Sequence, residues 1–176
     1  MLSIIIVNYK TSGEIDFCLK SIMRFEPHYR DYEFIIIDNN SNDSELKNLK
    51  EKYPFVKIIY APRNGGFAYG NNLGIKASQG EYILLLNPDT YIENNSIEKL
   101  YVKLKNSKDI FFAGPQLLNP DRSIQSYSGP KSYLTLWRLF CERLYLPRIF
   151  KRVHIFRNIL CILKSLIIVY RLLEKE

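Results

Sequence analysis

The sequence contains Leu-Leu-Asn-Pro-Asp twice, ending at Asp89 and at Asp121. In each copy a carboxylate and an amide oxygen lie two residues apart on a chain that proline stiffens. Such oxygen ligands suit Mg²⁺ or Mn²⁺, which proteins bind through one or two carboxylates while substrate phosphates complete the shell. Asn-Pro-Asp is also an ordinary turn, because short polar side chains bond their own backbone. The residues alone leave a metal site and a plain turn open.

A second polar group follows the apolar run Phe34–Ile37. In it, Asp38 and Asn39 offer hydrogen-bond acceptors and a donor that suit the edge of a nucleobase. The alternative is structural, with Asp38 opening an Asx turn and Ser41, Asp43 or Ser44 capping the next helix.

The segment RNGGFAYGNN, residues 63–72, is rich in glycine and precedes a predicted helix. Backbone N–H groups at such a place can face an anion. The segment matches neither GxGxxG nor GxxxxGK[ST], which argues against a dehydrogenase and a P-loop enzyme. A turn that needs a positive φ at Gly65 or Gly66 explains the glycines equally well.

Short apolar runs rich in β-branched residues predict four strands: Leu2–Val7, Phe34–Ile37, Val56–Tyr60 and Tyr82–Leu86. The stretches between them have helical spacing, as in Ile15, Cys18, Leu19, Ile22 and Met23. Strands that are apolar on both faces and alternate with helices indicate an α/β fold with a mainly parallel, doubly wound sheet. A helix over about 97–105, a strand over 110–113 and a hairpin over 119–128 are predicted to follow.

In such a sheet a ligand binds at the carboxyl ends of the strands. The polar residues after the four strands, including Asp38 and Asp89, fall at this edge, whereas Asp121 falls in the later hairpin. Position in the fold therefore favours a binding role for the first Asn-Pro-Asp and a turn for the second.

The charge of the chain is uneven. Residues 1–130 hold 15 basic and 15 acidic residues, whereas residues 131–176 hold 10 and 3 and account for the net charge of +7. A nucleic-acid-binding body is therefore not expected. Apolar residues recur at three- and four-residue steps over 148–173, which predicts a basic amphipathic helix. We expect a domain over 1–130 and a helical tail over 131–176 that lies on an anionic membrane, in a partner's groove or on its own domain.

The three cysteines are odd in number and lack a CxxC pair, so neither a disulfide framework nor a zinc site is indicated. The N-terminus reads as a strand and not as a signal peptide, because it lacks a basic region and a small-residue cleavage site. These features predict a cytoplasmic protein.

Four segments in this order, MLSIIIVNYK, IIIDNNSND, RNGGFAYGNNLGI and ASQGEYILLLNPDT, resemble the nucleotide-sugar half of family 2 glycosyltransferases. The rhamnosyltransferase-like branch is the most similar, and the likeness extends to about residue 135. It implies a GT-A fold. It also implies a metal-dependent, inverting transfer of a sugar from a nucleoside-diphosphate sugar such as dTDP-rhamnose to a polysaccharide or lipid-linked acceptor.

The resemblance also assigns roles to individual residues. Those implied to hold the base and ribose are Val7, Asn8, Tyr9, Asp38 and Asn39. Those implied to lie beneath the diphosphate are Asn64, Gly66 and Asn72. Asp89 matches the metal ligand of the family's Asp-x-Asp motif, with Mg²⁺ or Mn²⁺ as the implied cofactor, and Asn87 stands where many relatives have the first Asp. One fewer negative charge predicts weaker metal affinity. Asn71 replaces an Arg of many relatives, which puts one phosphate contact in doubt.

In the resembling family the catalytic base belongs to a second half that also holds the acceptor. After Asp121 this chain has only Glu142, Glu174 and Glu176 as acids, none in a recognisable setting, so no base is assigned. A partner chain could complete the site. The alternative function is a truncated, non-catalytic fragment that binds a nucleotide sugar or lies on the inner face of the cell membrane.

Overall fold

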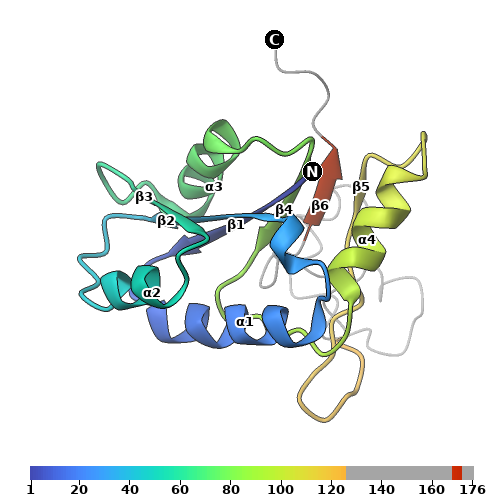
Figure 1. Ribbon diagram of the computed structural model, residues 1–176, viewed down its shortest axis with the longest axis horizontal. Helices are drawn as coiled ribbons and strands as arrows, with labels where there is room; N and C mark the ends of the chain where they lie inside the picture. Colours follow the sequence, from blue (N-terminus) through green and yellow to red (C-terminus); the bar gives the residue numbers. More distant parts are fainter. Residues whose placement is uncertain (126–167, 172–176) are drawn as a thin grey trace, which may run out of the picture. The chain divides into compact units, whose positions relative to one another are not determined.

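The computed structural model describes residues 1–125 and, for the backbone alone, 168–171. They fall into two units, Met1–Pro115 with Leu166–Glu176, and Gln116–Ser165. The strands of the first unit are β1 Leu2–Asn8, β2 Glu33–Asp38, β3 Val56–Tyr60, β4 Tyr82–Leu86, β5 Phe112–Ala113 and β6 Ile168–Arg171. Its helices are α1 Ser12–Phe25, α2 Leu46–Lys52, α3 Gly66–Ala77 and α4 Ser96–Lys105, with a 3₁₀ turn at Tyr29–Asp31 (Figure 1).

The strands form one sheet in the order β3-β2-β1-β4-β6-β5. Strands β1 to β4 are parallel, and β6 runs antiparallel to both β4 and β5. The mainly parallel α/β fold is therefore confirmed. The first four predicted strands are correct to within one residue at each end, while β5 is shorter than the predicted 110–113 because pairing covers only two residues.

The prediction of a helix is wrong for residues 168–171, which form β6. The physical reason is pairing. Ile168, Val169 and Tyr170 have high β propensity, and a strand at this place satisfies backbone groups of β4 on one side and β5 on the other. The rest of the predicted tail helix and the predicted boundary at residue 130 lie outside the described residues.

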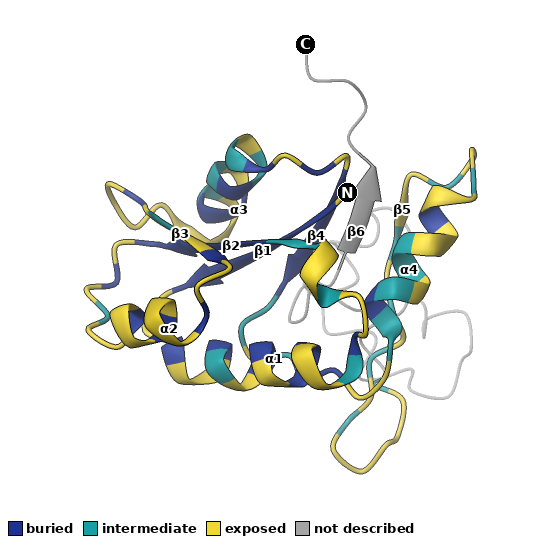
Figure 2. Cartoon of the chain, viewed as in Figure 1, coloured by how far each residue is buried: buried dark blue, intermediate teal, exposed yellow. Residues whose placement is uncertain are grey.

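Helices cover both faces of the sheet, with α3 on one face and α1 and α2 on the other (Figure 1). Helix α1 buries Ile15, Cys18, Leu19 and Ile22, as its spacing predicts, while Met23 is 39% exposed. Figure 2 shows the same division, with β1, β2 and β4 buried and the outer faces of the helices exposed. In the described part of the chain, no helix is both long and apolar enough to cross a membrane.

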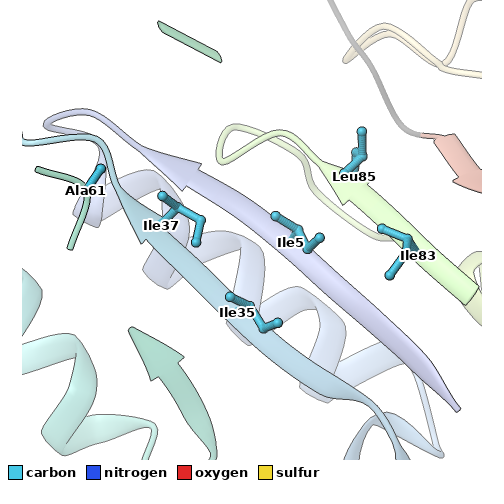
Figure 3. Close-up of a cluster of buried hydrophobic side chains, with 6 residues drawn as sticks. All are labelled: Ile5, Ile35, Ile37, Ala61, Ile83 and Leu85. Atoms are coloured by element: carbon cyan, nitrogen blue, oxygen red, sulfur yellow. The ribbon is translucent and has the colours of Figure 1, made fainter. Parts of the chain in front are cut away.

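Side chains of β1, β2 and β4, together with the residue that follows β3, form a buried cluster on the α3 side of the sheet: Ile5, Ile35, Ile37, Ala61, Ile83 and Leu85 (Figure 3). Leu73 and Tyr69 of α3 pack against it. Each fully buried aliphatic side chain contributes about 1.5–3 kcal/mol. The strand ends therefore project from a well-packed base.

Two glycines let α3 lie very close to β1. A Cβ at Gly70 would come within 2.8 Å of Val7 Cγ1, and one at Gly74 within 2.4 Å of Ile5 Cγ2. Both partner side chains are buried, so neither can move aside without disturbing the sheet. This close packing holds the first turn of α3 near the end of β1.

Asp16 joins α1 to α2 and predicts a pH-dependent contribution to stability. Its carboxylate contacts Lys20 (2.7 Å), Lys52 (2.6 Å) and the Tyr53 hydroxyl (2.7 Å). Partial burial alone would raise the pKa of Asp16, but these hydrogen bonds outweigh burial and lower the pKa from 3.8 to about 2.

Because the pKa is lowered on folding, the ionised carboxylate stabilises the fold at pH values above the pKa of the unfolded chain. This stabilisation is lost as the pH falls through about 2. We expect Asp16→Asn to reduce the free energy of unfolding at pH 7 by about 1 kcal/mol. Urea titrations should show this difference shrinking between pH 4 and pH 2, whereas a difference that is equal at pH 7 and pH 2 would contradict the assignment.

Candidate binding site at the carboxyl ends of the strands

Asn8 ties the ends of β1 and β2 together. It is fully buried, and its Nδ2 donates to Asp38 Oδ1 (3.0 Å) and Ser41 Oγ (3.2 Å). Its Oδ1 accepts from the N–H of Thr11 (3.0 Å), which fixes the turn into α1. The structure thus brings the predicted residues Asn8 and Asp38 into direct contact.

Asp38 shapes its own loop, as in its structural interpretation, but its bond reaches the residue three positions on and not two as in the predicted Asx turn. Its Oδ2 accepts from the Ser41 N–H (3.4 Å), its Oδ1 from the Ser41 hydroxyl, and Asp38 is only 5% exposed. Asn40 and Asn42 have positive φ values of 55° and 52°, which asparagine tolerates better than most residues. The carboxylate of Asp38 therefore shapes the loop, and contact with a base stays a prediction.

Asp43 braces the same loop and does not cap α2, which begins at Leu46 without a side-chain cap. The Ser12 hydroxyl donates to Asp43 (2.5 Å), as does the Glu45 N–H (3.1 Å). Partial burial acts to raise the pKa of Asp43, but these bonds outweigh it and the pKa lies below its ordinary value. An ionised Asp43 therefore fixes the start of α1 against the loop after β2.

The glycine-rich segment is bonded to the end of β2 through Asn39. Asn39 Nδ2 donates to Asn64 Oδ1 (2.8 Å), and Asn39 Oδ1 accepts from the Gly65 N–H (3.2 Å). The Gly66 N–H donates to Asn64 Oδ1 (3.0 Å), and Gly66 has a φ of +80°. The expected positive φ is confirmed, and these two N–H groups are already engaged by asparagine side chains.

An anion at α3 would therefore meet the next first-turn N–H groups, those of Phe67 and Ala68. Such groups have no partner within their helix, and both residues are exposed. Asn72 is exposed on the same helix, whereas Asn71 is buried.

The remaining residues of the first strand end differ in exposure. Val7 is 7% exposed and its side chain lies against Gly70, so only its backbone faces the edge. Tyr9 is 50% exposed. Of the predicted base-binding group, Tyr9 thus has the side chain that is free to contact a ligand.

Both copies of Asn-Pro-Asp fold into the same turn. The Thr90 N–H donates to the Asn87 carbonyl (3.3 Å), and the Arg122 N–H donates to the Asn119 carbonyl (2.8 Å). The second turn lies in the predicted hairpin, which an antiparallel bridge between Leu118 and Ile124 confirms.

The two copies differ in how their side chains are used. Asp121 Oδ1 accepts from the N–H (3.0 Å) and hydroxyl (2.6 Å) of Ser123, so this carboxylate holds its own turn. Within residues 1–125 nothing hydrogen-bonds to the side chains of Asn87 and Asp89, and Asp89 is exposed. The first copy therefore presents a carboxylate that the turn does not need.

Register places this carboxylate at the same edge as Asn8, because Leu86 pairs with Ile6 on the neighbouring strand.

Asp89 also lies near α1. Burial and, to a smaller extent, the charge of Asp89 raise the pKa of the Cys18 thiol to about 12. Cys18 is also only 1% exposed, so its thiol stays protonated within the core at neutral pH. No group of three or more His, Cys, Asp or Glu side chains in the described residues could hold a metal ion.

The glycosyl transferase family 2 model matches residues 3–158. The chain belongs to glycosyl transferase family 2. Among the relatives of this family 2 chain, the low-salt glycan biosynthesis hexosyltransferase Agl10 of Haloferax volcanii is 33% identical over 141 residues, which cover 78% of this chain and 43% of the relative. The poly(ribitol-phosphate) beta-glucosyltransferase of Bacillus spizizenii is 36% identical over 114 residues, covering 62% and 18%.

Among solved structures, residues 1–349 of S. aureus TarS in complex with UDP-GlcNAc align with a TM-score of 0.51 and 25% identity, over 58% of this chain and 30% of that one. The resemblance to the family and the GT-A-like fold are therefore confirmed. The family 2 chain spans less than half the length of these relatives.

Sequence reasoning missed Glu26, which the structure shows to be fully buried. Its carboxylate accepts backbone N–H bonds from Ile97 (2.8 Å) and Glu98 (3.1 Å) at the start of α4. A signal was present, because Glu26 follows Ile22 by four residues and so continues the apolar stripe of α1. An acid in a buried stripe needs donors, and these come from a distant helix.

Proposed function

We propose that this chain binds a nucleoside-diphosphate sugar at the carboxyl ends of β1, β2 and β4, and that it is the donor-binding half of a glycosyltransferase. The observation that carries the proposal is the exposed Asp89 carboxylate, which no described residue engages, at the same edge as the Asn8–Asp38 contact. Membership of the family and the likeness to TarS structures that contain UDP-GlcNAc or UDP support it.

The donor set fits Mg²⁺ or Mn²⁺ if phosphates complete it. Asp89 and Asn87 supply hard oxygen atoms, and one carboxylate with substrate phosphates is a usual arrangement for these ions. A site with three or more acidic, His or Cys ligands is not found in the described residues. We therefore propose that cation and donor bind together, with Asp89 as the protein's charged ligand. When bound, the cation would offset negative charge on the departing diphosphate.

Other residues are proposed to orient the donor. The exposed ring of Tyr9 suits contact with a base or ribose, and the N–H groups of Phe67 and Ala68 suit a phosphate at the helix N-terminus. Asn8, Asp38 and Asn39 would act mainly by holding the loops in place. The side chain of Asn8 bonds Asp38 and Ser41, and that of Asn39 bonds Asn64.

For the reaction we propose inverting transfer to a polysaccharide or lipid-linked acceptor, with dTDP-rhamnose as the donor within the nucleotide-sugar class. Such a transfer needs a base that takes the proton of the acceptor hydroxyl. We assign no base, and Glu142, Glu174 and Glu176 lie outside the described residues. Two further parts complete the proposal. A partner chain supplies this group, and the chain lies on the cytoplasmic, inner face of the cell membrane through the part of residues 148–173 that is outside β6.

A second candidate is a nucleotide-sugar-binding fragment that does not catalyse transfer. It needs no catalytic base, and no described residue is assigned that role. Both candidates share the binding site, and they differ in turnover.

Calorimetry on the 176-residue chain with UDP-, GDP- and dTDP-sugars, with and without Mn²⁺, tests the shared site. We expect uptake of at least one donor that Mn²⁺ strengthens. Release of nucleoside diphosphate from that donor then separates a transferase from a binding fragment. Failure of every donor to bind, with either Mn²⁺ or Mg²⁺, would refute both candidates.

A further inference from the structure

The segment that follows Asp89 is fixed to α1. The Ile92 N–H donates to Ser21 Oγ (3.0 Å), and further along the N–H groups of Ile97 and Glu98 donate to Glu26. Figure 1 shows the chain after β4 running along α1 before α4 begins. Residues 91–98 are therefore held from one helix at two separate points.

Aromatic rings add to this attachment. The ring of Tyr91 lies 5.7 Å from that of Phe17 and 6.2 Å from that of Phe25, centroid to centroid. Both partners belong to α1, and aromatic pairs at such distances attract each other beyond the effect of their buried area. The contacts begin two residues after Asp89.

Glu26 replaces the local cap that α4 lacks. The N-cap residue Asn95 makes no side-chain capping bond, although asparagine is among the best residues for that purpose. Glu26, 71 residues earlier in the chain, caps the helix instead. Burial raises the pKa of the Glu26 carboxyl and thus opposes its charged form, and the two N–H bonds counteract this. A local cap would satisfy the N–H groups of α4 without burying a carboxylate. The distant cap also fixes the start of α4 against the end of α1.

Helix α1 also connects this segment to the strand ends. Its start is fixed by the Thr11–Asn8 and Ser12–Asp43 bonds at the edge of the sheet. Its far end carries Glu26. The same rigid helix therefore sets both the Asn8 loop and the chain that leads away from Asp89.

We propose that Glu26 is a positioning residue, which together with Ser21 holds residues 91–98 on α1 and so fixes Asp89 in place for a cation-bound donor. This inference rests on the proposed function. It assigns to Glu26 an effect on binding that acts only through Asp89.

Removing the carboxylate should loosen the whole segment. In Glu26→Ala the N–H groups of Ile97 and Glu98 lose their acceptor, and we expect the Mn²⁺-dependent gain in donor affinity to fall about tenfold, as for other groups that orient a metal ligand. Donor affinity without Mn²⁺ should stay unchanged. Glu26→Gln keeps an uncharged acceptor and should restore part of the loss.

Ser3→Ala is the matched control. Ser3 is also fully buried and accepts a distant backbone N–H, that of Gly80 (2.9 Å), but it lies at the opposite ends of the strands. We expect this variant to lose stability while its Mn²⁺-dependent gain matches the wild type.

Hydrogen exchange gives a readout that does not need the cation. The Ile92 N–H bonds to Ser21 and not to Glu26, so faster exchange at Ile92 in Glu26→Ala would show that the segment moves as a unit. The opposite result is faster exchange at Ile97 and Glu98 alone, with unchanged exchange at Ile92 and unchanged Mn²⁺ dependence. It would show that Glu26 only caps α4, and it would overturn the inference. If the wild type binds no donor, the proposed function fails, and exchange at Ile92 still decides whether Glu26 fixes the segment.

Discussion

Asp89→Ala is expected to abolish the cation-dependent part of donor binding and, if the chain turns donor over, to lower kcat/KM by about 10²–10³-fold. The magnitude is that of losing one group that stabilises charge developing in the transition state. Asp89 is exposed and no described residue hydrogen-bonds to its carboxylate, so the thermal midpoint should hardly change. Calorimetry with and without Mn²⁺ measures the first effect, and thermal unfolding measures the second.

The chain supplies its own control in Asp121→Ala. Asp121 ends the same five-residue string and lies in the same type of turn, but its carboxylate already accepts a hydrogen bond from Ser123. This variant should loosen the hairpin and leave Mn²⁺-dependent binding as in the wild type. Equal effects of the two alanine variants on binding would show that Asp89 has no special role.

The double variant Gly70→Ala/Gly74→Ala should destabilise the fold by about 2–4 kcal/mol. Each added methyl would come within 3.0 Å of a buried side chain, Val7 or Ile5, so the cost lies in the upper part of the overpacking range, about 2–3 kcal/mol at each site. The better helix propensity of alanine offsets about 1 kcal/mol at each site. A fall of about 5–15 °C in the thermal midpoint is the expected measurement.

Gly13→Ala is the control for this pair, because a Cβ at Gly13 meets nothing within 4 Å. It should leave the midpoint unchanged or raise it slightly. The double variant should also weaken donor binding, since moving α3 away from β1 shifts its first turn. A double variant as stable as Gly13→Ala would mean that α3 does not press against the sheet as described.

The parallel strands could be predicted because their signal is local. Runs such as Ile4–Val7 and Ile35–Ile37 are apolar on both faces, which only a strand between two helix layers explains. Strand β6 could not be predicted this way. Residues 168–171 also fit a helical stripe, and the preference for a strand comes from unpaired edges of β4 and β5 that are distant in sequence.

The sequence predicted which edge of the sheet would carry the candidate site residues, but not which atoms those residues would contact. Asp38 and Asn39 were correctly placed at the end of β2, yet sequence could not show that their polar atoms bond Ser41 and Asn64. Likewise, identical strings at Asp89 and Asp121 gave no sign of which carboxylate its own turn would use. Such outcomes depend on partners brought close by folding.

Diffraction from crystals of the chain with Mn²⁺ and UDP, recorded at a wavelength where manganese scatters anomalously, would show whether Asp89 and a donor's diphosphate share a cation. We expect one anomalous peak within coordination distance of both the Asp89 carboxylate and the diphosphate, with the diphosphate facing the first turn of α3. Nucleotide bound at this edge with manganese absent from Asp89, or manganese and nucleotide bound elsewhere on the chain, would contradict it.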